Sequence, residues 1–221
     1  WALRHVQIKL GDYFNNARVL FFSGRTNYKL AAAMAEYTQN LEFADALLQL
    51  GVPKMLTSLD ALELYTSGAH YVLDWAPDGL MSSAPVKAWT KFVLRQAMRD
   101  ATVIVAPVHE LDGFGAEELA GKTIITSTVN DGRIAQFRKK GVNMVVDGAP
   151  ELFDHVLSPS LLDAMIIAAT EKAGDDILED DILEIITGLQ MAPRILYPNG
   201  FRRVNRFAFV IHPLSQEYFK N

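Results

Sequence analysis

The chain has 221 residues, of which 50% are hydrophobic, and its formal net charge at pH 7 is −5. This acidic balance argues against a general nucleic-acid-binding surface, and the absence of cysteine excludes disulfides, thiolate metal sites and thiol catalysis. No apolar run in the sequence approaches the roughly 20 residues that cross a bilayer. We therefore expect a cytoplasmic globular protein that binds neither membranes nor nucleic acid.

The first half of the chain alternates short apolar runs with helical patterns. Ser58 and Pro85 stand where a helix would begin, and Gly51 where one would end. The segments expected to be strands are 18–22, 53–57 and 70–75, and those expected to be helices are 29–37, 41–48, 59–65 and 86–100.

The second half repeats this alternation. Its apolar runs predict strands and its amphipathic stretches predict helices, with an acidic run at 175–181 interpreted as a solvated helix start. The expected strands are 101–106, 122–126 and 142–146, and the expected helices are 131–140, 158–172 and 180–189.

The alternation of strands with helices, and the near-continuous apolar runs of several strands, indicate a mainly parallel sheet covered on both faces. We therefore expect a three-layer, Rossmann-like α/β domain over residues 15–199, preceded by a lead segment at 1–14. Residues 200–221 would form a connector and an extra strand at 207–211, which either begins a further module or is added to a sheet, its own or that of a second copy in a homodimer.

Two polar loops follow apolar strands and precede helices. In parallel sheets, ligands bind beyond the carboxyl ends of the strands, where helix N-termini attract anions. We interpret both loops as contacts for a small anionic ligand, with Arg25 and Arg133 as the best candidates for holding a carboxylate or phosphate. The same residues also suit ordinary helix capping, and that alternative stays open. The candidates are Ser23, Gly24, Arg25, Thr26 and Asn27 in the first polar loop, and Ser127, Thr128, Asn130, Gly132 and Arg133 in the second.

Other chemical motifs are sparse. Neither polar loop contains a P-loop or a dinucleotide fingerprint, and the histidines do not have metal-binding spacing, so no metal site is expected. His109 follows a strand, beside Glu110 and Asp112, where a general acid or base would be placed. His109 and Asp112 are therefore weak catalytic candidates, with an uncommitted loop histidine as the alternative.

Three stretches resemble known families. The stretch from "GKTIITSTVNDGRIAQFRKKGVNMVVDGAPELFDHVLSPSLLDAMIIAA" through "APRILYPNG", and the earlier "PKMLTSLDALELY", are similar to bacterial proteins labelled quinate 5-dehydrogenase-like. The final "RFAFVIHPLSQEYFKN" resembles the opening strand of shikimate dehydrogenase-like NAD(P)-dependent dehydrogenases. Together these resemblances imply the N-terminal part of a longer oxidoreductase, in which NAD(P) would bind through a downstream domain. No catalytic residue of those families has a matching motif here.

The resemblance implies a substrate-binding or regulatory domain of a shikimate/quinate dehydrogenase-like oxidoreductase, with the two polar loops lining its ligand cleft. A non-catalytic interaction or dimerisation domain is the alternative. The residues themselves identify neither a substrate nor a cofactor.

Overall fold

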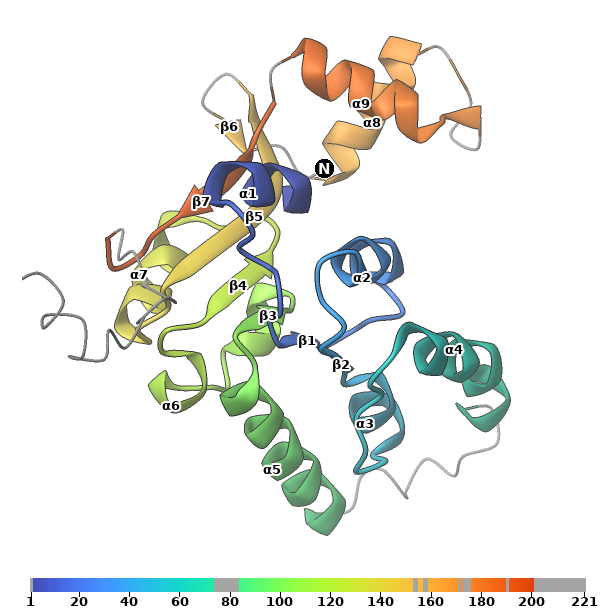
Figure 1. Ribbon diagram of the computed structural model, residues 1–221, viewed down its shortest axis with the longest axis vertical. Coiled ribbons are helices and arrows are strands. Elements are labelled where there is room, and N and C mark those ends of the chain that lie inside the picture. Colours follow the sequence, from blue (N-terminus) through green and yellow to red (C-terminus); the bar gives the residue numbers. More distant parts are fainter. Residues whose placement is uncertain are drawn as a thin grey trace, which may run out of the picture.

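The computed structural model describes residues 2–73, 84–152, 155–156, 159–170, 172, 176–189 and 191–200. A mixed β-sheet with helices on both faces makes up most of this part of the chain (Figure 1). The Rossmann-like three-layer architecture expected from the sequence is confirmed.

The centre of the sheet consists of five parallel strands in the order β2-β1-β3-β4-β5. Two further strands, β6 and β7, pair antiparallel with β5. The strands are β1 (Val19–Phe21), β2 (Leu41–Phe43), β3 (Val103–Val105), β4 (Thr123–Thr126), β5 (Met144–Leu152), β6 (His155–Val156) and β7 (Pro193–Leu196).

Alternating side chains of the central strands supply two hydrophobic clusters, one on each face of the sheet. Leu20 and Ile104 belong to one cluster, whereas Val19 and Phe21 belong to the other. The first cluster is completed by α3 (Asp45–Leu50), α5 (Ala84–Asp100), α6 (Ala116–Leu119) and α7 (Asp131–Lys139). The second is completed by α1 (Ala2–Leu10), α2 (Tyr28–Ala35) and α4 (Leu59–Leu73).

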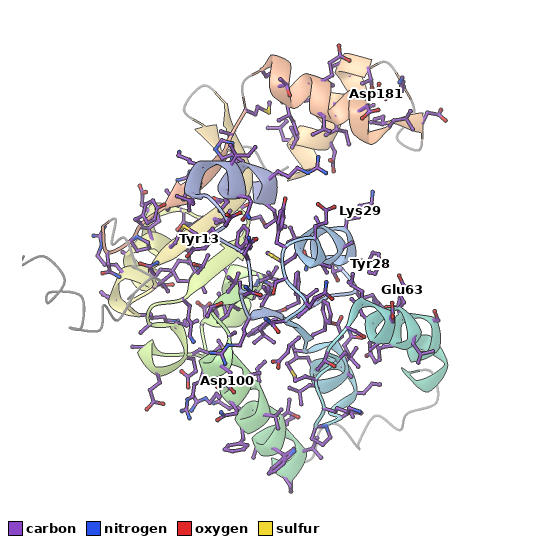
Figure 2. All side chains as sticks on the ribbon, in the orientation of Figure 1. Tyr13, Tyr28, Lys29, Glu63, Asp100 and Asp181 are labelled. Atoms are coloured by element: carbon purple, nitrogen blue, oxygen red, sulfur yellow. The ribbon has the colours of Figure 1, made fainter. Side chains whose placement is uncertain are left out.

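On the second face, α2 and α4 are joined by a polar contact. The Tyr28 hydroxyl donates a hydrogen bond to the Glu63 carboxylate, and Figure 2 shows the two side chains between these helices. Within the described ranges, none of the helices combines the length and the apolarity needed to cross a bilayer.

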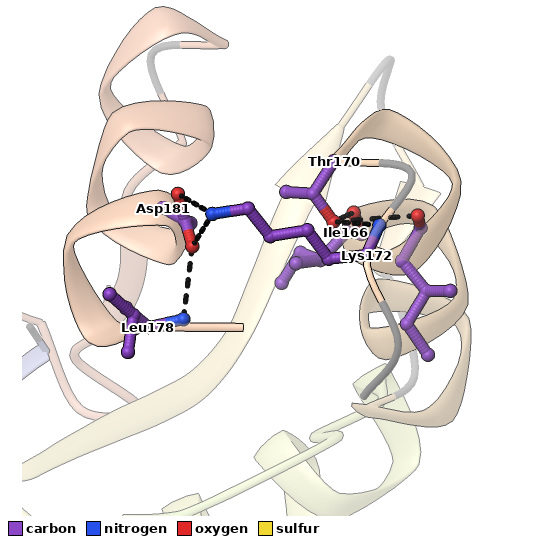
Figure 3. Close-up of polar contacts among 6 residues, drawn as sticks. Ile166, Thr170, Lys172, Leu178 and Asp181 are labelled. Atoms are coloured by element: carbon purple, nitrogen blue, oxygen red, sulfur yellow. Dashed lines mark hydrogen bonds and ion pairs between the residues drawn. The ribbon is translucent and has the colours of Figure 1, made fainter. Parts of the chain in front are cut away.

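Helices α8 (Pro159–Thr170) and α9 (Glu179–Gly188) form a hairpin beyond β6, apart from the layered body (Figure 1). A small apolar cluster that includes Ile186 and Met191 holds the two helices together. The Lys172 ammonium bridges both Asp181 carboxylate oxygens at 2.8 and 2.7 Å, and Asp181 also accepts the Leu178 N–H at 3.0 Å (Figure 3). The hydrogen bond from Lys172, with that from Leu178, lowers the pKa of Asp181. The acidic run therefore supplies a helix cap.

Most of the expected elements are confirmed to within a few residues. The strands predicted at 18–22, 101–106, 122–126 and 142–146 are β1, β3, β4 and the start of β5. The helices predicted at 29–37, 59–65, 86–100, 131–140, 158–172 and 180–189 are α2, α4, α5, α7, α8 and α9. Ser58 caps α4 by accepting the Ala61 N–H at 3.1 Å, and Gly51 ends α3 with a φ of 62°.

Three expectations are wrong. Segment 41–48 begins as strand β2 and turns helical only at Asp45, because Leu41 and Phe43 are buried beside β1. Segment 53–57 forms only an isolated bridge between Leu56 and Phe43. Residues 70–73 continue α4 as a helix, although their residue types favour a strand. The structure also adds β7, whereas the strand expected at 207–211 lies outside the described residues.

The lead segment packs into the body of the domain. Leu3 and Val6 of α1, and Phe14 after it, are buried in the same cluster as Val19 and Phe21. Residues 2–14 therefore contribute to the core of the α/β unit.

Replacement of Leu3 by Ala tests this packing. Leu3 is 3% exposed, so Leu3→Ala should lower the free energy of unfolding by about 2–5 kcal/mol. Ile8, on the same helix, is 86% exposed, and Ile8→Ala should change stability by less than about 0.5 kcal/mol. Urea unfolding monitored by circular dichroism measures both. Equal effects of the two substitutions would contradict the packing of α1.

Candidate functional site

The strand order places three polar segments along one edge of the sheet. The chain passes from β1 to β2 on one side and then returns to β3 on the other, so the order reverses between β1 and β3. In doubly wound sheets, ligands bind at the carboxyl ends of the strands where this reversal occurs. The first polar loop follows β1, residues 107–112 follow β3, and the second polar loop follows β4. All three therefore lie at the same edge.

A buried carboxylate organises the first polar loop. Asp45, at the start of α3, is 0% exposed and accepts the N–H groups of Gly24 and Arg25 at 2.7 and 3.0 Å. The remaining polar side chains bond within the loop: the Ser23 hydroxyl donates to Thr26 Oγ1 at 2.9 Å, and the Asn27 amide donates to the Ser23 carbonyl at 2.8 Å. The loop thus satisfies its own backbone through Asp45.

Close packing explains the glycine of this loop. A Cβ atom on Gly24 would lie 2.3 Å from Phe43 Cδ1 and 3.1 Å from Asp45 Oδ2. Any larger residue would therefore push the loop away from the carboxylate that it binds. The close packing of Gly24 against Phe43 and Asp45 therefore explains this glycine without a ligand.

The second polar loop has the same arrangement around Asp147, the last residue of β5 that pairs with β4. This carboxylate is 0% exposed and accepts the N–H groups of Thr128 and Val129, each at 2.8 Å. It also accepts the Ala149 N–H at 3.0 Å and an Arg194 Nη1 hydrogen bond at 3.3 Å. Arg194, on β7, donates as well to the Val129 carbonyl at 3.0 Å.

In both loops, the carboxylate comes from the side away from β3. Asp45 follows β2, which lies outside β1, and Asp147 belongs to β5, which lies outside β4. The paired backbone donors therefore face away from the reversal point between β1 and β3. An external anion at these loops would bind through side chains, because internal carboxylates already occupy the N–H groups on which the sequence-based hypothesis depended.

The two candidate arginines differ in their surroundings. Arg133 donates to the Asp112 carboxylate and to Gln136 Oε1, the latter at 2.9 Å. The Arg25 guanidinium is exposed and forms neither a hydrogen bond nor an ion pair with any residue that the structure describes. Burial raises the pKa of Tyr65, which lies on α4 at the β2 side of the loop, and the positive charge of Arg25 partly opposes this effect. Arg25 is thus the more available of the two.

The other candidates of the second polar loop lie at its surface. Asn130 caps α7 by accepting the Arg133 N–H at 2.9 Å. Ser127, Thr128 and Gly132 are exposed, and Thr128 has a φ of 61°. Capping accounts for Asn130, as the alternative interpretation of the sequence held.

The His109 and Asp112 side chains form no hydrogen bond or ion pair with each other. Asp112 pairs with Arg133. Between His109 and Asp112 there is a backbone hydrogen bond, which the Asp112 N–H donates to the His109 carbonyl at 3.3 Å. His109 is exposed on the short 3₁₀ helix η1 (Val108–Leu111). Among the described residues, there is also no group of three acidic or histidine side chains placed to hold a metal ion.

Glu110, on η1, is the group at this edge that stands out chemically. Its side chain is half-buried, and Oε2 is a buried oxygen with no hydrogen-bond partner among the described residues. Burial raises the pKa of Glu110, and the neighbouring His109 partly opposes this effect. The Thr126 hydroxyl, at the end of the adjacent strand β4, is likewise buried without a partner in the described part of the chain.

Sequence reasoning noted Glu110 only as a neighbour of His109, and it missed Asp45, Asp147 and Thr126. A recognisable signal exists for Asp147, which directly follows the apolar run "MVV". The burial of Glu110 has no comparable signal, because it depends on how η1 folds over the end of β3.

Loss of the Asp147 carboxylate should destabilise the domain. Asp147→Ala would remove the acceptor of three N–H groups and one acceptor of the Arg194 guanidinium, at a cost of about 3–5 kcal/mol in the free energy of unfolding. Asp112→Ala, which removes an exposed carboxylate paired to Arg133, should cost no more than about 1 kcal/mol. Chemical denaturation compares the two variants. An Asp147→Ala protein as stable as Asp112→Ala would contradict this role.

The raised pKa of Glu110 predicts a pH effect on stability. The folded state holds the Glu110 proton more tightly than the unfolded chain, so this group's contribution to stability falls as pH rises from its unfolded pKa through its folded pKa. Glu110→Gln should therefore gain stability relative to the wild type between pH 4 and pH 7, by less than about 1 kcal/mol because the group is partly hydrated. Thermal unfolding at both pH values measures the gain, and the exposed Glu36→Gln variant should lack it.

Comparison with known proteins identifies a family. The family described as "Domain of unknown function (DUF8754)" matches residues 1–198. Comparison with curated proteins and comparison with solved structures each gave no match. The matched range includes α1, the whole parallel sheet, the α8–α9 hairpin and β7. The chain therefore belongs to the DUF8754 family.

Proposed function

We propose that this domain binds a small hydroxylated acid at the carboxyl edge of its sheet, as the substrate-binding or regulatory domain of a shikimate/quinate dehydrogenase-like NAD(P)-dependent oxidoreductase. The observation that supports it most is the buried Glu110 oxygen, which has no partner in the described part of the chain and lies beside the point where the strand order reverses. A buried polar group without a partner is unfavourable, and a ligand hydroxyl that donates to it would remove that penalty.

Other groups at the same edge of the sheet suit the rest of such a ligand. The Thr126 hydroxyl, also without a partner in the described residues, offers a donor or an acceptor at the end of the next strand. The exposed Arg25 guanidinium offers a fork for a carboxylate. Polyhydroxylated carboxylates such as quinate and shikimate combine both kinds of group, and they are the ligands that the sequence resemblance implies.

The contribution of this domain is binding and orientation. Glu110 would accept a hydrogen bond from the ligand, and Arg25 would neutralise the ligand's charge. Redox chemistry would belong to an NAD(P)-binding domain, since neither polar loop has a dinucleotide fingerprint.

The alternative of an interaction domain is favoured by a different observation. The α8–α9 hairpin exposes several large apolar side chains: Leu161, Ile167, Leu178 and Leu189 are 49%, 43%, 64% and 44% exposed. Exposed apolar groups on a projecting hairpin are typical of a surface that meets another protein.

A thermal-shift series separates the two proposals. Quinate or shikimate should raise the melting temperature of the wild-type chain by a few degrees at saturation. Glu110→Gln should weaken the apparent affinity by about tenfold or more, because one charge-assisted hydrogen bond is lost. NAD, NADP and inorganic phosphate serve as comparison ligands, and Glu117→Gln, an exposed acid on α6, serves as the control variant.

Two outcomes would count against binding at this site. If the hydroxy acids stabilise the wild type and Glu110→Gln equally, Glu110 is not part of the site. If none of the compounds stabilises the chain and sedimentation shows self-association, the interaction domain is the better proposal.

A further inference from the structure

A separate cavity lies at the opposite, amino edge of the sheet. It measures about 230 Å³ and is formed by Arg18 and Val19 at the start of β1, residues 39–42 at the start of β2, Thr57, and the end of α5. Figure 2 labels Asp100, which lies at that end of α5. The volume is below the range of sites for drug-sized molecules, so its occupant would be small.

Glu42 is an unusual residue to find in this wall. It lies in β2 between Leu41 and Phe43, which are 4% and 0% exposed, and its own side chain is half-buried. The carboxylate accepts no hydrogen bond from any residue that the structure describes. Burial raises the pKa of Glu42, the charge of Asp100 raises it further, and Arg18 opposes both effects. An acid in this position is unfavourable to the fold unless something pairs with it.

The cationic groups around the cavity differ in what they bind. The Lys122 ammonium donates to the carbonyls of Arg99 and Ala101 at 2.6 and 2.5 Å, so its hydrogen bonds are directed at the end of α5. Arg18 lines the same cavity as Glu42. Its guanidinium forms no hydrogen bond or ion pair with Glu42 or with any other residue that the structure describes. The cavity is therefore lined by residues of opposite charge that do not pair with each other.

Protection of a sheet edge is the competing explanation for Glu42. Charged residues on edge strands discourage pairing with other chains. However, the outer edge of β2 is already occupied beside Glu42, where Phe43 and Leu56 exchange two backbone hydrogen bonds at 2.8 and 3.0 Å. Because this pairing already covers the edge, a charge at Glu42 is less needed to prevent pairing with another chain.

We propose that this cavity binds a small zwitterion of the amino-acid class, with its ammonium group toward Glu42 and Asp100 and its carboxylate toward Arg18. Asp100 already accepts one hydrogen bond, from Gln96 at 3.2 Å, and a carboxylate has capacity for more. The two carboxylates and the guanidinium match a ligand with both charges better than they match a simple anion or cation. This site lies at the other end of the strands from Glu110 and does not depend on the function proposed above.

Calorimetric titration of the full chain tests this proposal. The panel contains glycine, alanine, serine, aspartate and lysine, with lactate as an analogue without an ammonium group and ethylamine as one without a carboxylate. At least one amino acid should bind with a dissociation constant below about 1 mM, and both analogues should bind at least about tenfold more weakly.

The matched variants are Glu42→Gln and Glu36→Gln, since Glu36 is an exposed acid outside the cavity. Glu42→Gln should fold, because no described hydrogen bond is lost, and should weaken amino-acid binding by at least about tenfold, whereas Glu36→Gln should bind as the wild type does. Binding of quinate should be unchanged by Glu42→Gln.

Either of two results would overturn the proposal. The first is that no amino acid in the panel binds at millimolar concentration. If Glu42→Gln then self-associates, the role of Glu42 is to protect the sheet edge. The second is that the amino acid binds Glu42→Gln as tightly as it binds the wild type.

Discussion

Two buried carboxylates determine how this fold turns from strand to helix at its carboxyl edge. Asp45 and Asp147 are both fully shielded from solvent, and each gathers successive N–H groups from the loop that follows the neighbouring strand. The conformation of each loop follows from this contact, including the close approach of Gly24 to Phe43 and the positive φ of Thr128. The similar composition of the two loops is thus explained by one structural solution that the domain uses twice.

Residue patterns predicted the central strands and the long helices, because these elements carry their own local signal. The segments around β1, β3 and β4 are mostly apolar, and the start of α4 has a capping serine at Ser58. Segments whose structure depends on distant partners were predicted less well. Strand β2 is only three residues long and contains Glu42, so its neighbour β1 decides its conformation. Strand β7 contains Pro193 and Arg194, and it forms because β5 offers a free side for antiparallel pairing.

The candidate site was predictable in location but not in chemistry. The alternation of strands and helices was enough to place both polar loops and His109 at one edge of a parallel sheet. The partners of these residues depend on tertiary contacts across 18 to 21 positions, such as Thr128 N–H with Asp147 and Arg133 with Asp112, and no local pattern encodes them. The half-buried acids Glu110 and Glu42 stand at opposite ends of the strands, and in both cases burial is the largest cause of a raised pKa. Only the folded chain distinguishes these two acids from ordinary surface glutamates.

Arg194 connects the last described strand to the second polar loop. Its guanidinium contacts the Val129 carbonyl and the Asp147 carboxylate, whereas its backbone pairs with β5. A displacement of β7 would move this side chain and so withdraw one donor from the carboxylate that holds residues 128 and 129. The bridge therefore couples the position of β7 to the conformation of the loop after β4.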